Sequence, residues 1–151
     1  MVLGHQRIHV RNGEREFDLV TTEERDSKPP ITITQHDVRE IQLAKGAIGT
    51  GIQILLEANG KTEQDIDEVI VAGAFGSYID ITSAITIGML PDLPLSCFRP
   101  MGNAAGMGAK LALLSLSKRA EAQLIARQVH YIELAAAPFF EKTFVNAINL
   151  R

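Results

Sequence analysis

Alternating apolar and polar residues run along the start of the chain on both sides of Asn12-Gly13. This pattern predicts two antiparallel strands over residues 6–20, because an Asn-Gly pair suits a type I′ turn with positive φ at both central residues. Residues 21–30 are polar, end in two prolines and predict a surface loop. A short strand, ITIT at residues 31–34, is predicted to follow the loop.

A long amphipathic helix is predicted after this strand. Thr34 and Asp37 have the spacing of a capping box, in which each side chain bonds a free backbone N–H of the other residue. Asn59-Gly60 supplies a left-handed stop. The apolar stripe of the helix recurs every three or four residues: Val38, Ile41, Ala44, Ile48, Ile52 and Leu55.

Three glycines interrupt the predicted helix, at Gly46, Gly49 and Gly51. Each costs up to ~1 kcal/mol relative to alanine, so their repetition indicates that something approaches the helix backbone closely. Tight packing on a sheet is the alternative explanation.

Lys45, beside these glycines, has two open interpretations. Its stem follows apolar surface while its ammonium reaches water, or it stands at the rim of a ligand cleft.

The middle of the chain alternates predicted strands and helices. A capped turn at residues 62–67 leads into EVIVAGA, whose continuous apolar run is typical of a central strand buried on both faces. Asp80 is predicted to cap a short helix. SCFRP, residues 96–100, predicts a further strand, and GNAAGMGAKLALLSL predicts a glycine-led, alanine-rich helix.

The last third of the chain predicts two helices and one strand. A helix begins near Lys118, a strand-like VHYIEL follows at residues 129–134, and Pro138 opens an amphipathic helix with three phenylalanines. The complete order of elements is that of an α/β fold with a mixed sheet flanked by helices.

Composition excludes several classes of protein. The chain has 151 residues, 46% hydrophobic and 22% charged, which fits one globular domain. Its net charge of −3 provides no basic face for nucleic acid, and no apolar run approaches the ~20 residues of a membrane helix. Cys97 is the single cysteine, so we expect a reducing, cytoplasmic setting, a buried thiol and no cluster held by this chain alone.

Few residues are candidates for chemistry. His5 and His9 are four apart on a predicted strand, which spreads them rather than forming a metal site. GAFGSY at residues 73–78 matches neither the dinucleotide fingerprint nor the phosphate loop. What remains is an apolar strand, a glycine and a helix start, where a backbone without Cβ admits a flat ligand or a phosphate. A strand-leaving turn that binds nothing is the alternative.

Several unusual strings in register resemble one known family. ITITQHDVREIQLAKGAIGTGIQILLEANG, VIVAGAFGSYID, IGMLPDLP and GNAAGMGA resemble the C-terminal actin-like (ASKHA) ATPase domain of the reductive activators of corrinoid proteins. The likeness runs from residue 31 to about residue 145. It implies a ribonuclease-H-like lobe, the second of two lobes that close on ATP.

The resemblance also implies roles for single residues. VAGAFGS is similar to the adenosine motif, QLAKGAIG to the helix along adenine and ribose, and GNAAGMGA to a connecting helix that packs closely at the hinge between lobes. The implied nucleotide contacts are Gln42, Lys45, Gly46, Gly49, Gly73, Gly76 and Ser77, and the implied hinge residues are Gly102, Ala105 and Gly108. No catalytic residue and no metal ligand is implied within this chain.

For the whole protein, the resemblance implies ATP with Mg²⁺, a [2Fe–2S] ferredoxin-like domain outside this chain, and a corrinoid iron–sulfur or methyltransferase corrinoid protein as partner. We expect a fragment with a hairpin and loop over residues 1–30, a nucleotide-side core over 31–115 and a helical tail over 116–151. ATPase activity is expected only in the full-length parent. A non-catalytic interaction or homodimerisation module, and a fragment of an actin-like small-molecule kinase, remain alternatives.

Overall fold

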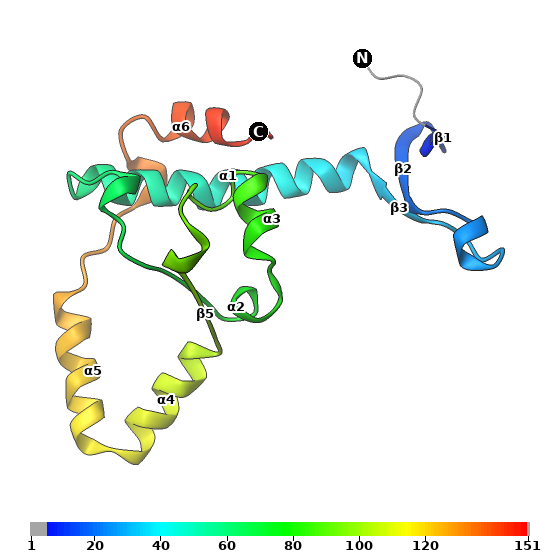
Figure 1. The fold of residues 1–151 in the computed structure, drawn as a ribbon. Coiled ribbons are helices and arrows are strands. Elements are labelled where there is room, and N and C mark those ends of the chain that lie inside the picture. The colour runs from blue at the N-terminus through cyan, green and yellow to red at the C-terminus, as the bar shows by residue number, and fades with distance from the viewer. Residues whose placement is uncertain (1–5, 151) are drawn as a thin grey trace. The chain divides into compact units, whose positions relative to one another are not determined.

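Two compact units divide the chain, Met1–Ala44 and Lys45–Arg151. The structure, a computed structural model, describes residues 6–150, without the side chain of Phe75 (Figure 1). Its elements are β1 (Ile8–Arg11), β2 (Glu14–Val20), β3 (Ile31–Thr34), α1 (Gln35–Ala58), β4 (Val69–Ala72), α2 (Phe75–Tyr78), α3 (Ile81–Thr86), β5 (Phe98–Gly102), α4 (Ala104–Leu114), α5 (Leu116–Gln128) and α6 (Phe140–Ala147). His5, considered as a metal ligand above, lies outside the described residues.

The first unit contains the predicted hairpin and a third strand. Asn12 and Gly13 have φ of 52° and 82°, the two positive values that a type I′ turn requires. β1, β2 and β3 form an antiparallel sheet in that order. Ile8 lies opposite Phe17, which lies opposite Ile33, so one face of the sheet is apolar. The predicted hairpin and short strand are confirmed.

The opposite face of this sheet carries a charged cluster around Asp18. This carboxylate is only 4% exposed. Arg11 Nη1 lies 3.0 Å from Asp18 Oδ1, and His9 Nε2 lies 3.0 Å from Asp18 Oδ2. The hydrogen bond from Arg11 is the main reason that the pKa of Asp18 lies below its ordinary 3.8. Sequence analysis missed this cluster because only the strand register brings its members together.

Helix α1 begins and ends where the sequence predicts. The Thr34 amide donates to Asp37 Oδ2 at 2.8 Å and the Asp37 amide donates to Thr34 Oγ1 at 3.1 Å, which completes the capping box. Gly60 follows the helix with φ of 61°. The boundary between the two units falls within α1, after Ala44.

The second unit contains a separate, two-stranded parallel sheet. β4 pairs with β5 from Val69 opposite Phe98 to Ala72 opposite Gly102. The described strands therefore form two sheets, and the prediction that β4 is a central strand buried on both faces is wrong for the described residues. β5 is the only described strand beside β4, and Ile70 is 49% exposed. A continuous apolar run predicts burial correctly only where layers cover both faces of the strand.

The C-terminal third differs from the prediction in one segment. Val129 to Glu133 form no strand, and Leu134–Ala136 form a 3-10 turn instead. The predicted amphipathic helix is confirmed as α6, in which the rings of Phe140 and Phe144 stack with centroids 5.8 Å apart. The short helix capped by Asp80 is confirmed as α3, since Asp80 Oδ1 accepts from the Ser83 amide at 2.7 Å.

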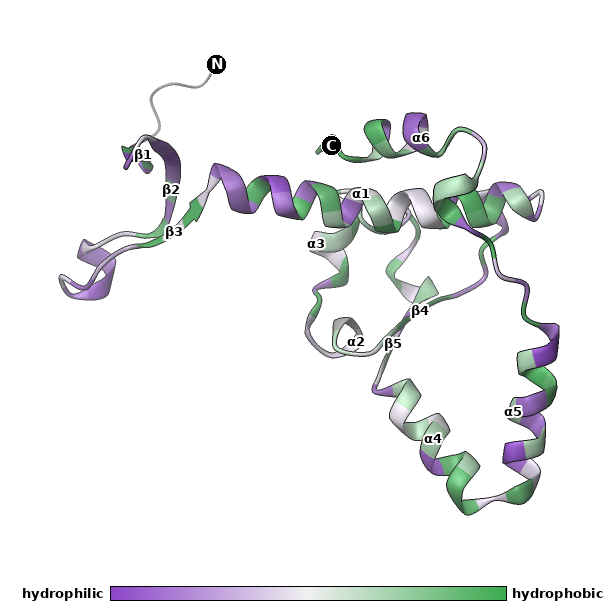
Figure 2. Ribbon diagram, turned by 180° about the vertical axis from the view of Figure 1, so that it is seen from behind, coloured by the Kyte–Doolittle hydropathy of each residue, from purple (hydrophilic) through white to green (hydrophobic). Residues whose placement is uncertain are grey.

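Helices α4 and α5 contact each other and contain no buried residue. Figure 2 shows hydrophobic stretches along both. Within residues 6–150, no helix is both long and apolar enough to cross a membrane. The exposed apolar side chains of α4 and α5 are Met107, Leu111, Leu113, Leu114, Leu116, Leu124 and Ile125.

Replacing Asp18 by Asn is expected to destabilise the first unit at neutral pH and to lose this effect in acid. Because the folded pKa lies below the ordinary 3.8, the carboxylate contributes stability that is complete well above that value and is lost as the pH falls through the lowered pKa. Urea unfolding followed through the β1 and β2 amide resonances, from about pH 5 to about pH 2, measures the difference between the two proteins.

The matched control is Glu14→Gln, an exposed carboxylate in the same hairpin. For Glu14→Gln, we do not expect the difference in unfolding free energy from the wild-type protein to shrink in the same way on acidification. If the difference in unfolding free energy between Asp18→Asn and the wild-type protein stays constant or widens on acidification, the stabilising role given to the Asp18 carboxylate is wrong.

Candidate functional site

The turn after β4 and the end of β5 form one local structure. Gly73 has φ of +76° and Gly102 has φ of +53°, conformations that side chains with a Cβ rarely adopt. The Gly73 amide donates to the Gly102 carbonyl. The carboxyl ends of the two parallel strands therefore lie side by side, at the edge where open α/β sheets commonly bind ligands.

Gly76 fits into this structure only because it has no side chain. A Cβ on Gly76 would lie 2.1 Å from the Val71 carbonyl oxygen and 2.9 Å from the Gly102 amide nitrogen. Ser77 Oγ is 3.6 Å from the place of a Cβ on Gly102. The structure thus brings the predicted residues Gly73, Gly76 and Ser77 together with Gly102, and Ser77 is exposed.

Of the predicted hinge residues, Gly102 ends β5, and Ala105 and Gly108 lie in the first half of α4. Asn103 caps this helix, since its Oδ1 accepts from the Gly106 amide at 2.9 Å. Ala105 is exposed, and no described atom lies within 4 Å of the place of a Cβ on Gly108. Close packing at these residues and their hinge role therefore stay predictions.

Lys45 is buried, and its place at the rim of a ligand cleft stays a prediction. It is 2% exposed, and its Nζ donates to the backbone oxygen of Asn149. The interpretation in which its ammonium reaches water is therefore wrong. The cause is the C-terminal segment after α6, which packs on the same side of α1. Ile148 Cγ2 is 2.7 Å from the place of a Cβ on Gly46.

The other two residues predicted on this helix lie apart from that contact. The place of a Cβ on Gly49 is 3.5 Å from the Gly88 carbonyl oxygen, an ordinary van der Waals distance. Gln42 is half-buried and belongs to the first unit. Gly49 is the only predicted nucleotide contact among the described residues that line the cavity discussed next.

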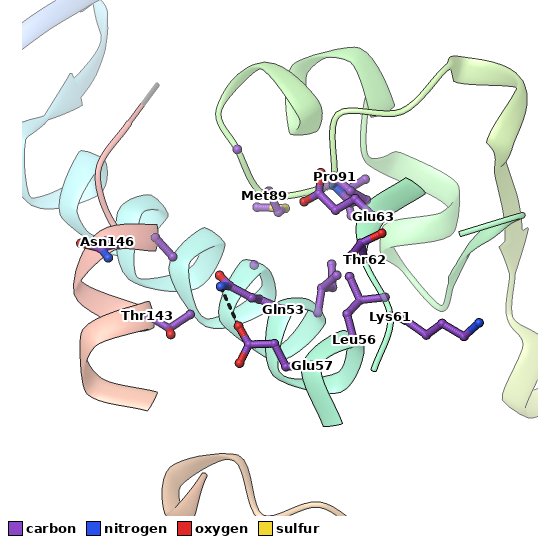
Figure 3. Close-up of a pocket in the computed structure, with 15 residues that line it drawn as sticks. Gln53, Leu56, Glu57, Lys61, Thr62, Glu63, Met89, Pro91, Thr143 and Asn146 are labelled. Carbon is purple, nitrogen blue, oxygen red and sulfur yellow. Dashed lines mark hydrogen bonds between the residues drawn. The ribbon is translucent and has the colours of Figure 1, made fainter. Parts of the chain in front are cut away.

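A cavity of about 500 Å³ opens beside α1 in the second unit (Figure 3). Gln53 and Glu57 of α1 form one wall, and Gln53 Nε2 donates to Glu57 Oε1 at 3.0 Å. Thr143 and Asn146 of α6 form another wall. Sequence analysis missed this cavity because its lining comes from separate segments without a shared motif. Turn residues complete it: Lys61, Thr62, Glu63, Gly88, Met89, Leu90 and Pro91.

Comparison with known proteins decides the family. Residues 2–151 match the family described as "C-terminal domain of RACo the ASKHA domain". The chain belongs to this family. A solved structure named "Reductive activator for corrinoid,iron-sulfur protein" matches with a TM-score of 0.83 and 38% identity, over 95% of this chain and 23% of that one. The predicted resemblance and the α/β fold of an actin-like ASKHA domain are confirmed.

Two curated relatives of this ASKHA domain have names that state an activity. "Corrinoid activation enzyme RamQ" of Eubacterium limosum is 44% identical over 134 residues, covering 89% of this chain and 23% of that protein. "[Co(II) methylated amine-specific corrinoid protein] reductase" of Methanosarcina barkeri is 29% identical over 101 residues, covering 67% and 18%. The matched part of the chain therefore spans less than a quarter of the length of each relative.

Replacing Gly76 by Ala is expected to destabilise this ASKHA domain, because the added methyl collides with the Val71 carbonyl and the Gly102 amide. Overpacking of this kind costs about 1–3 kcal/mol. Gly108→Ala is the matched control, and we expect it to stabilise α4 by about 0.5–1 kcal/mol, since a helical glycine gains from alanine where space is free. Urea unfolding of both variants measures the difference. Equal effects of the two substitutions contradict the packing described for Gly76.

Proposed function

We propose that the chain is the adenosine-side part of an ATP-dependent activator of corrinoid proteins, in which nucleotide binding controls lobe closure and electron transfer. Family membership and a 44% identical relative named as a corrinoid activation enzyme support this proposal. The observation that carries the nucleotide assignment is the turn after β4, where Gly73 has φ of +76° and no described atom lies within 4 Å of the place of its Cβ.

The proposed adenosine contacts follow from this turn and from α1. Gly73 leaves open backbone without a Cβ at the carboxyl edge of the parallel strands, Gly76 lets the turn pack against Val71 and Gly102, and Ser77 adds an exposed hydroxyl. A flat base or a ribose can approach such backbone closely. Lys45 and Gly46 of α1 provide a cation and a second bare stretch of backbone for the same nucleotide.

ATP hydrolysis and reduction need groups beyond those assigned here. Phosphoryl transfer depends on Mg²⁺ and on positioned charge around the phosphates, and no residue of this chain is assigned to either. A [2Fe–2S] cluster needs four ligands, normally cysteine thiolates. Because Cys97 is the single cysteine of the sequence, these residues alone do not fit such a cluster. We place both chemistries in a longer protein, with a corrinoid protein as the recipient of the electron.

One observation favours a second candidate function. Leu113, Leu114 and Leu116 at the junction of α4 and α5 are 75%, 73% and 80% exposed, and apolar surface of this kind marks contact sites. An interaction or dimerisation module without a ligand would also use it. Sedimentation of the protein with and without ATP separates the two, because only the proposed function makes its behaviour depend on nucleotide.

The Ser77→Leu variant of the full-length protein is expected to bind ATP at least about tenfold more weakly, a loss of about 1.4 kcal/mol. The exposed position admits the larger side chain without disturbing the turn, and the side chain then fills space that the proposal gives to adenosine. Isothermal titration with Mg-ATP measures the affinity, and reduction of the corrinoid protein measures the activity.

Ser117→Leu is the control for this experiment, since Ser117 is an exposed serine on α5. We expect it to leave ATP affinity unchanged. If Ser77→Leu binds ATP as tightly as the wild-type protein, the nucleotide assignment of the β4–α2 turn is wrong.

A further inference from the structure

We propose that the cavity beside α1 binds a protonated aliphatic amine, a ligand that the proposed function does not include. The described residues that line it all belong to the second unit, and its volume is about 500 Å³. Ligand pockets of proteins commonly measure about 300–1,000 Å³. The inference does not rest on the nucleotide assignment, because Gly49 alone of the predicted nucleotide contacts is among these described lining residues.

The charge of the lining favours a cation. Its described charged side chains are the carboxylates of Glu57 and Glu63 and the ammonium of Lys61. Figure 3 shows the Lys61 side chain extending away from Gln53 and Glu57. The neighbouring sequence adds negative potential, because residues 57–68 include five acidic residues and one basic residue. An acidic surface attracts cations and repels phosphates, so a nucleotide does not fit this cavity.

Free hydrogen-bond acceptors line the cavity. A carboxylate only accepts, so the Gln53 amide nitrogen is the donor in its 3.0 Å bond to Glu57 Oε1. Gln53 Oε1 and Glu57 Oε2 therefore remain available. Among the described residues, the side chains of Glu63, Thr143 and Asn146 make no hydrogen bond or ion pair. An ammonium group has three N–H donors and no acceptor, which matches these oxygen atoms.

The apolar part of the lining indicates an organic cation rather than a metal ion. Leu90, which is buried, lines the cavity together with Leu56, Met89 and Pro91. A methylene chain is stabilised by leaving water for such surface. Within residues 6–150, no group of three or more His, Cys, Asp or Glu side chains is arranged to hold a metal ion. An aliphatic amine satisfies both the carboxylates and the apolar side chains.

Local hydrogen bonds hold two walls of the cavity in place without a ligand. The Thr62 amide donates to Asp65 Oδ2 at 2.8 Å, and this capping box fixes the turn that carries Glu63. In the other turn, the Met89 amide donates to the Ala84 carbonyl at 2.9 Å. A site that is formed in advance loses little conformational entropy when its ligand binds.

The test is calorimetric titration of the full-length protein with putrescine, an aliphatic diamine, and with butanediol, its uncharged analogue. We expect saturable binding of putrescine and no binding of butanediol. Glu63→Gln keeps the size of the side chain and removes its charge, so it should weaken putrescine binding at least about tenfold. Asp67→Asn is the matched control, because Asp67 is an exposed carboxylate outside the lining. We expect it to change the affinity less than about twofold, since solvent screens exposed charges.

A second measurement uses the wild-type protein alone. Met89 lines the cavity, whereas Met107 is 57% exposed on α4. We expect putrescine to shift the methyl resonance of Met89 in the NMR spectrum and to leave the methyl resonance of Met107 in place.

Four results overturn the inference. They are absence of putrescine binding, butanediol binding as tight as that of putrescine, equal weakening by Glu63→Gln and Asp67→Asn, and a Met89 methyl resonance that does not move. If Glu63→Gln unfolds the protein, the comparison of putrescine with butanediol and the Met89 resonance of the wild-type protein still decide the question.

Discussion

Close approach to the backbone of helix α1 is the constraint on which the second unit depends. Three glycines face three different segments: Gly46 faces Ile148, Gly49 faces the Gly88 carbonyl and Gly51 faces Leu134. Only at Gly46 is the approach closer than a Cβ allows. A glycine in a helix costs about 1 kcal/mol, and the contact that Gly46 permits is the docking of the C-terminal segment beside the buried Lys45.

A glycine also permits close packing at the β4–α2 turn. There Gly76 allows the short helix α2 to pack against the carboxyl ends of the parallel strands β4 and β5. Outside these close contacts the chain buries little apolar surface. Among the described residues, the buried large or small apolar side chains are those of Ile54, Ala84 and Leu90. Uncovered apolar surface on α4 and α5 agrees with the proposal that the chain is one part of a longer activator.

Local signals in the sequence predicted local structure well. The Asn12-Gly13 turn and the capping boxes at Thr34 and Thr62 depend on neighbouring residues, and the structure contains all three. Contacts between segments that are distant in the sequence were not predictable from such local signals. The apolar run of β4 indicated a strand but not how many strands lie beside it, and the segment after Val129 was mistaken for a strand because periodicity does not reveal whether a partner edge exists.

In the candidate site, too, local features were predictable from the sequence and long-range contacts were not. Its glycines were found from the sequence because positive φ and missing Cβ atoms restrict residue type, whereas the bond from Lys45 to Asn149 joins positions that no local pattern connects. Photolabelling of the full-length protein with 8-azido-ATP, followed by peptide mapping, tests the central claim most directly. The account predicts label at residues 45–49 and 73–77 that excess ATP prevents. Label confined to other peptides, or insensitive to ATP, would contradict it.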